Sequence, residues 1–202
     1  MIKYANMNLQ PDWYQLGLTE YFLLANPNQS VYEKVMAEKW DFFHRYGIEI
    51  AIKTAPHITI ANFLVKERIE GLLCKGVQNV CNLQCSFHVG LKNFAGFKNR
   101  AIYICVQNQE PFKRLAKNLQ RLDDIIEVSP KHPTILVDKA HMTIARQLDA
   151  ETYERAMQEY SQYKFQELFL LEKLTLLKRD SYCEKWKKVS DFYLPQERNL
   201  FN

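Results

Sequence analysis

The chain has 202 residues, a formal net charge of +4 at pH 7 and a sequence pI of about 8.7. A mildly basic globular protein suits an anionic ligand, but the charge is too small for a dedicated duplex-binding domain. No apolar run approaches the roughly 20 residues that a membrane helix needs, and the first residues lack the apolar stretch of a signal peptide. We therefore expect one domain over residues 1–202, located in the cytoplasm.

The elements expected along the chain mix strands and helices. Segments rich in β-branched and aromatic residues predict strands at 20–26, 57–63, 84–94, 101–107, 141–147, 167–179 and 191–195. Helical patterns cover 30–47, 66–80, 111–126 and 149–163. Ser30 and Asp149 are the expected N-caps, and Gly47 ends the first helix. The loose alternation, with several adjacent strands, favours an α+β fold over a strictly parallel sheet.

A five-residue pattern occurs twice, 84 positions apart. His57 begins the run HITIA and His141 begins HMTIAR. Each copy closes a strand–helix–strand unit, the first over 20–63 and the second over 101–147. Five histidines and seven threonines in 202 residues predict only roughly 0.2 His-x-Thr matches by chance. The pair therefore indicates function, although either copy alone would be read as an ordinary strand.

A third match, His132-Pro133-Thr134, competes with the second copy. Its central proline has no N–H to donate to a strand ladder, and it lacks the alanine that follows His-x-Thr-Ile in the other two copies. We therefore assign the second motif to His141.

In a strand, residues i and i+2 face the same side. His57 and Thr59 should therefore point together, as should His141 and Thr143, with apolar residues between them facing the core. Imidazole can give or take a proton near neutral pH, and a hydroxyl can donate to a phosphate oxygen as charge accumulates there. Two such pairs suit acid–base displacement on a phosphodiester. We expect no metal and no cofactor, because neither a carboxylate cluster nor an HExxH helix is present.

The five cysteines add no metal site. Without a secretion signal they predict reduced thiols, and Cys81 and Cys85 have the wrong spacing for a zinc knuckle.

The paired motifs, one in each half, resemble those of the 2H (two-histidine) phosphoesterase superfamily, which includes bacterial 2′-5′ RNA ligases and 2′,3′-cyclic phosphodiesterases. The resemblance implies a bilobal fold in which two antiparallel sheets flank a central cleft, with helices outside. It implies catalytic roles for His57 and His141 and phosphate contacts from Thr59 and Thr143. Members open 2′,3′-cyclic phosphates, or join RNA ends in the reverse direction.

The expected activity is thus a metal-independent phosphodiesterase acting on nucleotides or RNA ends. A 2′-5′ RNA ligase using the same site, or a non-catalytic RNA- or nucleotide-binding module, remains an alternative. We expect a monomer that binds neither duplex DNA nor a membrane.

Four further residues are candidates for substrate binding. Tyr21, Phe22 and Tyr103 lie on predicted strands near the motifs and could stack on a base, although aromatic residues more often fill cores. Arg146 lies five positions after His141, so regular alternation turns it away from the motif face. It reaches the substrate only if the strand ends or bulges there.

Overall fold

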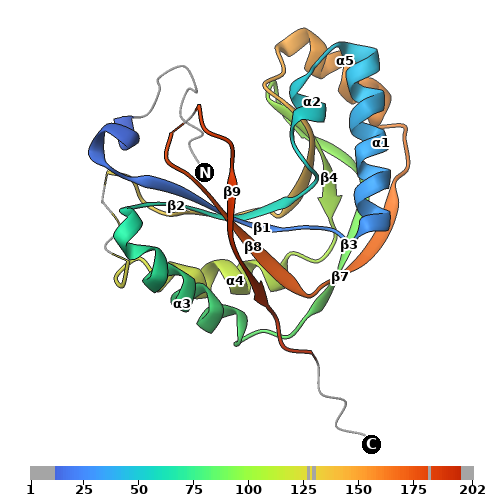
Figure 1. Ribbon diagram of the computed structural model, residues 1–202. Helices are drawn as coiled ribbons and strands as arrows, with labels where there is room; N and C mark the ends of the chain where they lie inside the picture. The colour runs from blue at the N-terminus through green and yellow to red at the C-terminus, as the bar shows by residue number, and fades with distance from the viewer. Residues whose placement is uncertain (1–11, 127, 129–130, 182, 197–202) are drawn as a thin grey trace, which may run out of the picture.

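The computed structural model describes residues 12–126, 128, 131–181 and 183–196 and contains two antiparallel sheets with helices around them (Figure 1). The strands are β1 Thr19–Ala25, β2 Ile58–Val65, β3 Phe87–Phe97, β4 Ala101–Val106, β5 Ile135–Leu136, β6 His141–Arg146, β7 Gln166–Leu171, β8 Lys173–Arg179 and β9 Lys187–Tyr193. The α-helices are α1 Gln29–Tyr46, α2 Ile50–Lys53, α3 Glu70–Cys81, α4 Glu110–Gln120 and α5 Ala150–Tyr160, and two 3-10 turns cover Asp12–Leu16 and Glu67–Ile69.

The five-stranded sheet has the order β5-β2-β1-β8-β9, and the four-stranded sheet has the order β6-β4-β3-β7. Every strand pair is antiparallel. This arrangement confirms the expected α+β class with two antiparallel sheets. The motif strand β2 is an inner strand of its sheet, whereas the motif strand β6 is an edge strand, and the two lie against each other where the sheets meet.

The helix within each of the two similar units packs against the sheet of the other unit. Helix α1 joins β1 to β2 but packs against β6 and β7 of the other sheet. Helix α4 precedes β6 in the chain but packs against β2 and β5. Figure 1 shows α3 and α4 together on one side of the five-stranded sheet, with α1 and α5 on the outside of the four-stranded sheet. Each motif strand is therefore supported by a helix from the other unit.

Alternating burial along β1 and β2 explains how the first sheet holds its core. Tyr21, Leu23 and Ala25 are fully buried on one face, and Ile58 and Phe63 of β2 are fully buried beside them. This face carries α3, whose Glu70 accepts a hydrogen bond from Tyr21, and α4, which packs against β2 and α3. Burying a leucine, isoleucine or phenylalanine side chain contributes about 1.5–3 kcal/mol. The opposite face of β1 and β2 is left to carry the first motif.

The helix ends follow capping chemistry. The cap of α1 is Asn28 rather than the expected Ser30: its side chain accepts a hydrogen bond from Val31 N at 3.0 Å, and the helix begins one residue before Ser30. Gly47 ends α1 in a left-handed conformation with φ of 69°, which a glycine adopts without strain. Asp149 caps α5, accepting from Thr152 N at 2.8 Å, as predicted.

One glycine that weakened the helix prediction for residues 66–80 has a packing role. A Cβ atom on Gly76 of α3 would lie 2.8 Å from Leu122 Cδ2, so any larger residue there would require the Leu122 side chain to move. The helix itself begins at Glu70, after the 3-10 turn. Helix α4 is shorter than expected, since it ends at Gln120 instead of near residue 126.

The long segment 167–179 is two strands, not one. It breaks at Glu172, so that β7 joins the edge of the four-stranded sheet and β8 lies in the five-stranded sheet between β1 and β9. Glu172 O accepts a hydrogen bond from Leu194 N at 2.8 Å at this crossing point. Both halves have strand composition, so their division depends on which partner strands each one meets. Within the described ranges, no helix has both the length and the apolar character that crossing a membrane requires.

Candidate active site

The first motif lies at the start of β2. Pro56 precedes His57, and the strand proper begins at Ile58. Ile58 and Ile60 are fully buried in the core, whereas His57 and Thr59 are half-buried on the other face. Thr59 is paired with Leu24 of β1 in the register of the sheet. The alternation predicted for this motif is therefore present.

The second motif begins β6 and repeats this arrangement. Met142 and Ile144 have no exposed surface, while His141 and Thr143 are half-buried on the opposite face. His141 is paired with Cys105 and Thr143 with Tyr103 of β4. Neither Thr59 nor Thr143 has a hydrogen-bond partner for its hydroxyl within the described part of the chain. Both hydroxyls can therefore donate to a bound anion.

A β-bulge follows the threonine in each motif strand. In β6 the register passes from Thr143 opposite Tyr103 to Ala145 opposite Ile102, which leaves Ile144 without a partner. The extra residue shifts the alternation, so that Arg146 joins the face of His141 and Thr143. The condition set by the sequence for Arg146 to reach the site is met.

The bulge in β2 has the same effect on the first motif. Thr59 lies opposite Leu24 and Ala61 opposite Leu23, so Ile60 is the unpaired residue. Asn62 therefore shares the face of His57 and Thr59. The repeat thus extends one residue beyond the shared five letters, to Asn62 in one copy and Arg146 in the other.

The two imidazoles are held in the same way. His57 Nδ1 lies 2.8 Å from the carbonyl oxygen of Ala55, and His141 Nδ1 lies 2.7 Å from that of Lys139, in each case two residues earlier. A carbonyl oxygen only accepts, so Nδ1 carries the proton in both rings. The lone pair of each neutral imidazole is then on Nε2, which leaves that atom free to exchange a proton with a substrate.

Burial lowers the pKa of both imidazoles below the ordinary value of 6.5. For His57 the donated backbone hydrogen bond opposes this, and three positive charges then lower the pKa further, those of Lys39, Arg146 and His141. Since the charge of one histidine acts on the other, the two motif faces share one electrostatic environment. A positive charge on one ring disfavours protonation of its partner. The favoured state then has one protonated and one neutral imidazole, which is what paired acid and base catalysis needs.

A charged network lies beside the first motif. Glu20 accepts hydrogen bonds from Asn62 Nδ2 and from Arg179 Nε, both at 2.6 Å. Arg146 has no carboxylate partner among the residues that the structure describes. Partial burial and the charge of Arg179 both lower its pKa. Two arginines from opposite sheets are thus held near each other, an arrangement that an anion between them would stabilise.

Aromatic rings surround His141. Its ring centroid lies 4.9 Å from that of Tyr103 and 5.1 Å from that of Phe97. Tyr103, a candidate for substrate binding, is on the motif face but only 2% exposed, and its hydroxyl accepts from Lys139 Nζ at 2.9 Å. It therefore fixes the His141 ring rather than offering an open stacking surface.

A second aromatic group lies on the other sheet. Phe22, opposite Asn62, packs against Trp186 with ring centroids 5.0 Å apart. The Arg179 guanidinium lies 4.5 Å from the centre of the Trp186 ring, which is 37% exposed. Trp186 comes from the segment between β8 and β9, and no local pattern marked it as part of the site. It is the more accessible surface for a base to stack on.

Two residues that the sequence offered as candidates, Tyr21 and His132, lie away from the motif faces. Tyr21 is on the core face of β1, fully buried, with its hydroxyl donating to Glu70 Oε2 at 3.1 Å. The structure therefore does not bring it to the motif face; its neighbour Phe22 lies there instead. His132 belongs to a bend before β5, and its companion Thr134 donates to Asp123. That third match is outside any strand, consistent with the proline argument.

Metal ligands do not gather in this region. Over the described ranges, no group of three or more His, Cys, Asp or Glu residues has the arrangement to hold a metal ion. All five cysteines are free thiols. The chemistry available at the motif faces is that of imidazole, hydroxyl and guanidinium groups.

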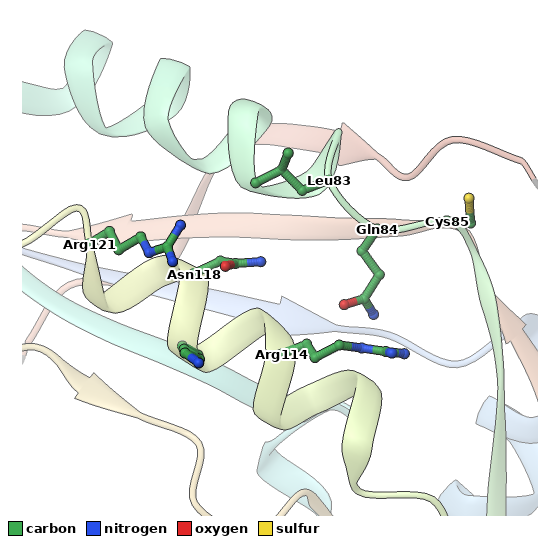
Figure 2. A pocket seen from close by; sticks show the side chains of 7 residues that line it. Leu83, Gln84, Cys85, Arg114, Asn118 and Arg121 are labelled. Carbon is green, nitrogen blue, oxygen red and sulfur yellow. The ribbon is translucent and has the colours of Figure 1, made fainter.

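A basic cavity is separate from these residues. It has a volume of about 390 Å³ and lies between the end of α3 and helix α4, with Gln84, Arg114 and Arg121 in its lining (Figure 2). Because α3 and α4 cover the face of the five-stranded sheet that carries Tyr21, this cavity lies on the opposite side of that sheet from Thr59. It contains no motif residue.

Comparison with known proteins links this geometry to a family. The model of the 2′-5′ RNA ligase superfamily matches residues 32–182, which include both motifs. No curated protein matches the chain at a significant level.

Solved structures match the fold at low sequence identity. E. coli LigT in complex with 3′-AMP is 13% identical with a TM-score of 0.65, and the match covers 89% of this chain and 99% of LigT. TT0787 of Thermus thermophilus is 14% identical with a TM-score of 0.64, covering 88% and 99%. The MHV ns2 PDE domain is 14% identical with a TM-score of 0.52, covering 80% and 99%. At such identities the likeness shows the fold.

Proposed function

Because the chain belongs to the 2′-5′ RNA ligase superfamily, we propose that it is a metal-independent phosphodiesterase that opens 2′,3′-cyclic phosphates of nucleotides or RNA ends. The observation that carries the proposal is the matched pair of imidazoles. Each ring is fixed through Nδ1 to the carbonyl two residues before it, and each shares its strand face with a threonine whose hydroxyl has no partner in the described chain. One histidine and threonine held in this way could arise from packing alone. The same arrangement on two strands supports a catalytic role.

In the proposed reaction a water oxygen attacks phosphorus while one imidazole takes a proton from the water. The bond from phosphorus to one ribose oxygen breaks, and the other imidazole, which is protonated at the start, gives its proton to that oxygen. Water and the cyclic diester are consumed, a ribose monophosphate is formed, and one of the two Nε2 atoms carries a proton at the end, as one did at the start. Thr59, Thr143 and Arg146 donate to the non-bridging oxygens, where negative charge accumulates.

The nucleoside would rest on the aromatic groups around the site. Trp186, supported by Phe22 and Arg179, offers an exposed ring for a base. Structures of E. coli LigT hold 3′-AMP, NADP+ and ATP, which agrees with a nucleotide ligand for this chain.

The deciding experiment measures turnover of a panel of 2′,3′-cyclic nucleotides in EDTA, with identification of the monophosphate product. We expect the wild type to be active, and His57→Ala and His141→Ala each to lose about 10²–10⁴-fold in kcat. The matched control is His44→Ala, which removes a histidine stacked on Trp40 of α1. Full activity in either motif variant would reject the two-histidine mechanism.

The alternatives require their own assays. RNA halves ending in a 5′-hydroxyl and a 2′,3′-cyclic phosphate test the ligase reading, in which the 5′-hydroxyl replaces water as the attacking group. Nucleotide binding that survives loss of both motif histidines, with no turnover of any phosphodiester, would favour a binding module instead.

A further inference from the structure

Lys39 is a lysine buried in the core, where a charged side chain is not expected. It continues the buried stripe of α1 formed by Val31 and Val35, and only 1% of its surface is exposed. Lysine is almost never buried to this extent without a paired charge. No carboxylate pairs with it in the part of the chain that the structure describes.

The partners of Lys39 are two backbone carbonyls of the second motif. Its Nζ atom donates to the carbonyl oxygen of Thr143 at 3.0 Å and to that of Ile144 at 3.1 Å. Ile144 is the unpaired residue of the bulge that turns Arg146 to the motif face. Lys39 therefore holds the backbone at the point where the strand departs from regular alternation.

The first motif shows what Lys39 replaces. The bulge residue there is Ile60, and its carbonyl oxygen accepts from the backbone N–H of Val137 at 2.8 Å, next to β5. Strand β2 has β5 as a neighbour on that side, whereas β6 is the edge strand of its sheet, with no neighbour beyond it among the described residues. A buried carbonyl without a donor is costly. On the edge strand, a lysine from α1 supplies the donor that a neighbouring strand supplies in the other sheet.

We propose that Lys39 is a positioning residue for the second motif: its ammonium group takes the place of the missing neighbour strand, fixes the bulge at Ile144 and so aims Arg146 and Thr143 at the bound phosphate. The catalytic consequence rests on the proposed function, whereas the structural consequence does not. The exchange of α1 between the units explains why the residue lies 104 and 105 positions from the two carbonyls that it holds.

The kinetic test compares Lys39→Met with Lys34→Met. Methionine preserves length and apolar volume while removing the donor, and Lys34 lies on the same helix but pairs at the surface with Glu167. We expect Lys39→Met to lower kcat on the cyclic nucleotide by roughly 10–100-fold, since a displacement of about 1 Å at a reacting centre costs on that order. We expect Lys34→Met to retain wild-type kcat, and unfolding curves of both variants to show that they are folded.

A double-mutant cycle separates positioning from general destabilisation. If Lys39 acts through Arg146, the loss caused by Lys39→Met should largely disappear in an Arg146→Ala background. An equal loss in both backgrounds would overturn the proposal. Lys39→Arg, which keeps donors and charge, should recover part of the activity if it folds.

NMR spectra test the role of Lys39 without depending on enzyme activity, so the result can be separated from a test of the proposed reaction. In ¹H–¹⁵N spectra, Lys39→Met should shift the amide signals of residues 144–146, and it should weaken binding of inorganic phosphate as followed by the same signals. Shifts confined to α1, with residues 144–146 unchanged, would reject the role of Lys39. An inactive wild type with the expected shifts would instead reject only the proposed reaction.

Discussion

The burial of Lys39 should make the stability of the protein depend on pH in a way that one variant isolates. Burial, with a smaller contribution from the charge of Arg146, lowers the pKa of the Lys39 ammonium from 10.5 to about 8. Below pH 8 the folded and unfolded chains both carry the proton. Between pH 8 and 10.5 the unfolded chain binds more protons than the folded chain, so the free energy of unfolding rises with pH. The gain is complete above the unfolded pKa and is lost as the pH falls through 8.

The size of this effect follows from the shift. A change of one pKa unit corresponds to 1.36 kcal/mol, so a shift of this size predicts about 3 kcal/mol across the window. The neutral amine still has two N–H groups, so both carbonyls of the bulge keep their donor throughout.

The assay is urea unfolding followed by tryptophan fluorescence from pH 7 to 10.5, for wild type and Lys39→Met. Other groups also titrate here: burial raises the pKa of Tyr46 to about 12, for example. Subtracting the curve of the variant removes their contribution. We expect the wild-type value to gain about 3 kcal/mol over the variant between pH 8 and 10.5. A difference that stays flat would refute the conclusion that a charged lysine is buried at this position.

Three other predictions follow from the site. Thr143→Val should lower kcat about 10²-fold or more while leaving the unfolding midpoint nearly unchanged, because it removes a donor to the phosphate; an unaltered kcat would exclude that contact. Trp186→Ala should raise KM for nucleotides about 5-fold or more with little change in kcat, as measured by steady-state kinetics, whereas an unchanged KM would show that the base lies elsewhere. The lowered pKa values of His57 and His141 mean that stability present above pH 6.5 is lost as the pH falls through 6.5 and then through the folded values; replacing both by glutamine should flatten this part of the curve in urea titrations, and an identical slope would contradict it.

Local patterns accounted for the motifs themselves. Alternation along HITIA and HMTIA placed each histidine and threonine on one face and the isoleucines or methionine on the other, as observed. The proline of the third match excluded it from a strand. Such features depend on steric rules within a few residues, so the sequence is sufficient to predict them.

Local sequence patterns do not predict the register between paired strands. The bulge at Ile144 decides whether Arg146 shares the face of His141 and Thr143 or faces the core, and it exists only in the pairing of β6 with β4. The division of residues 167–179 at Glu172 likewise depends on two different partner strands. The composition of a segment predicts that it forms a strand, but not which strand it pairs with, because ladder hydrogen bonds join residues far apart in the chain.

The sequence by itself therefore determined the two His-x-Thr pairs, the α+β class and most helix and strand positions. The tertiary structure alone decided that α1 crosses to the other unit, that Lys39 occupies a core position in order to hold an edge strand, and that Trp186 approaches the first motif. Lys39 did carry one local sign, a charged residue in the stripe of Val31 and Val35. Its meaning depended on the missing neighbour of β6, which only the completed sheet reveals.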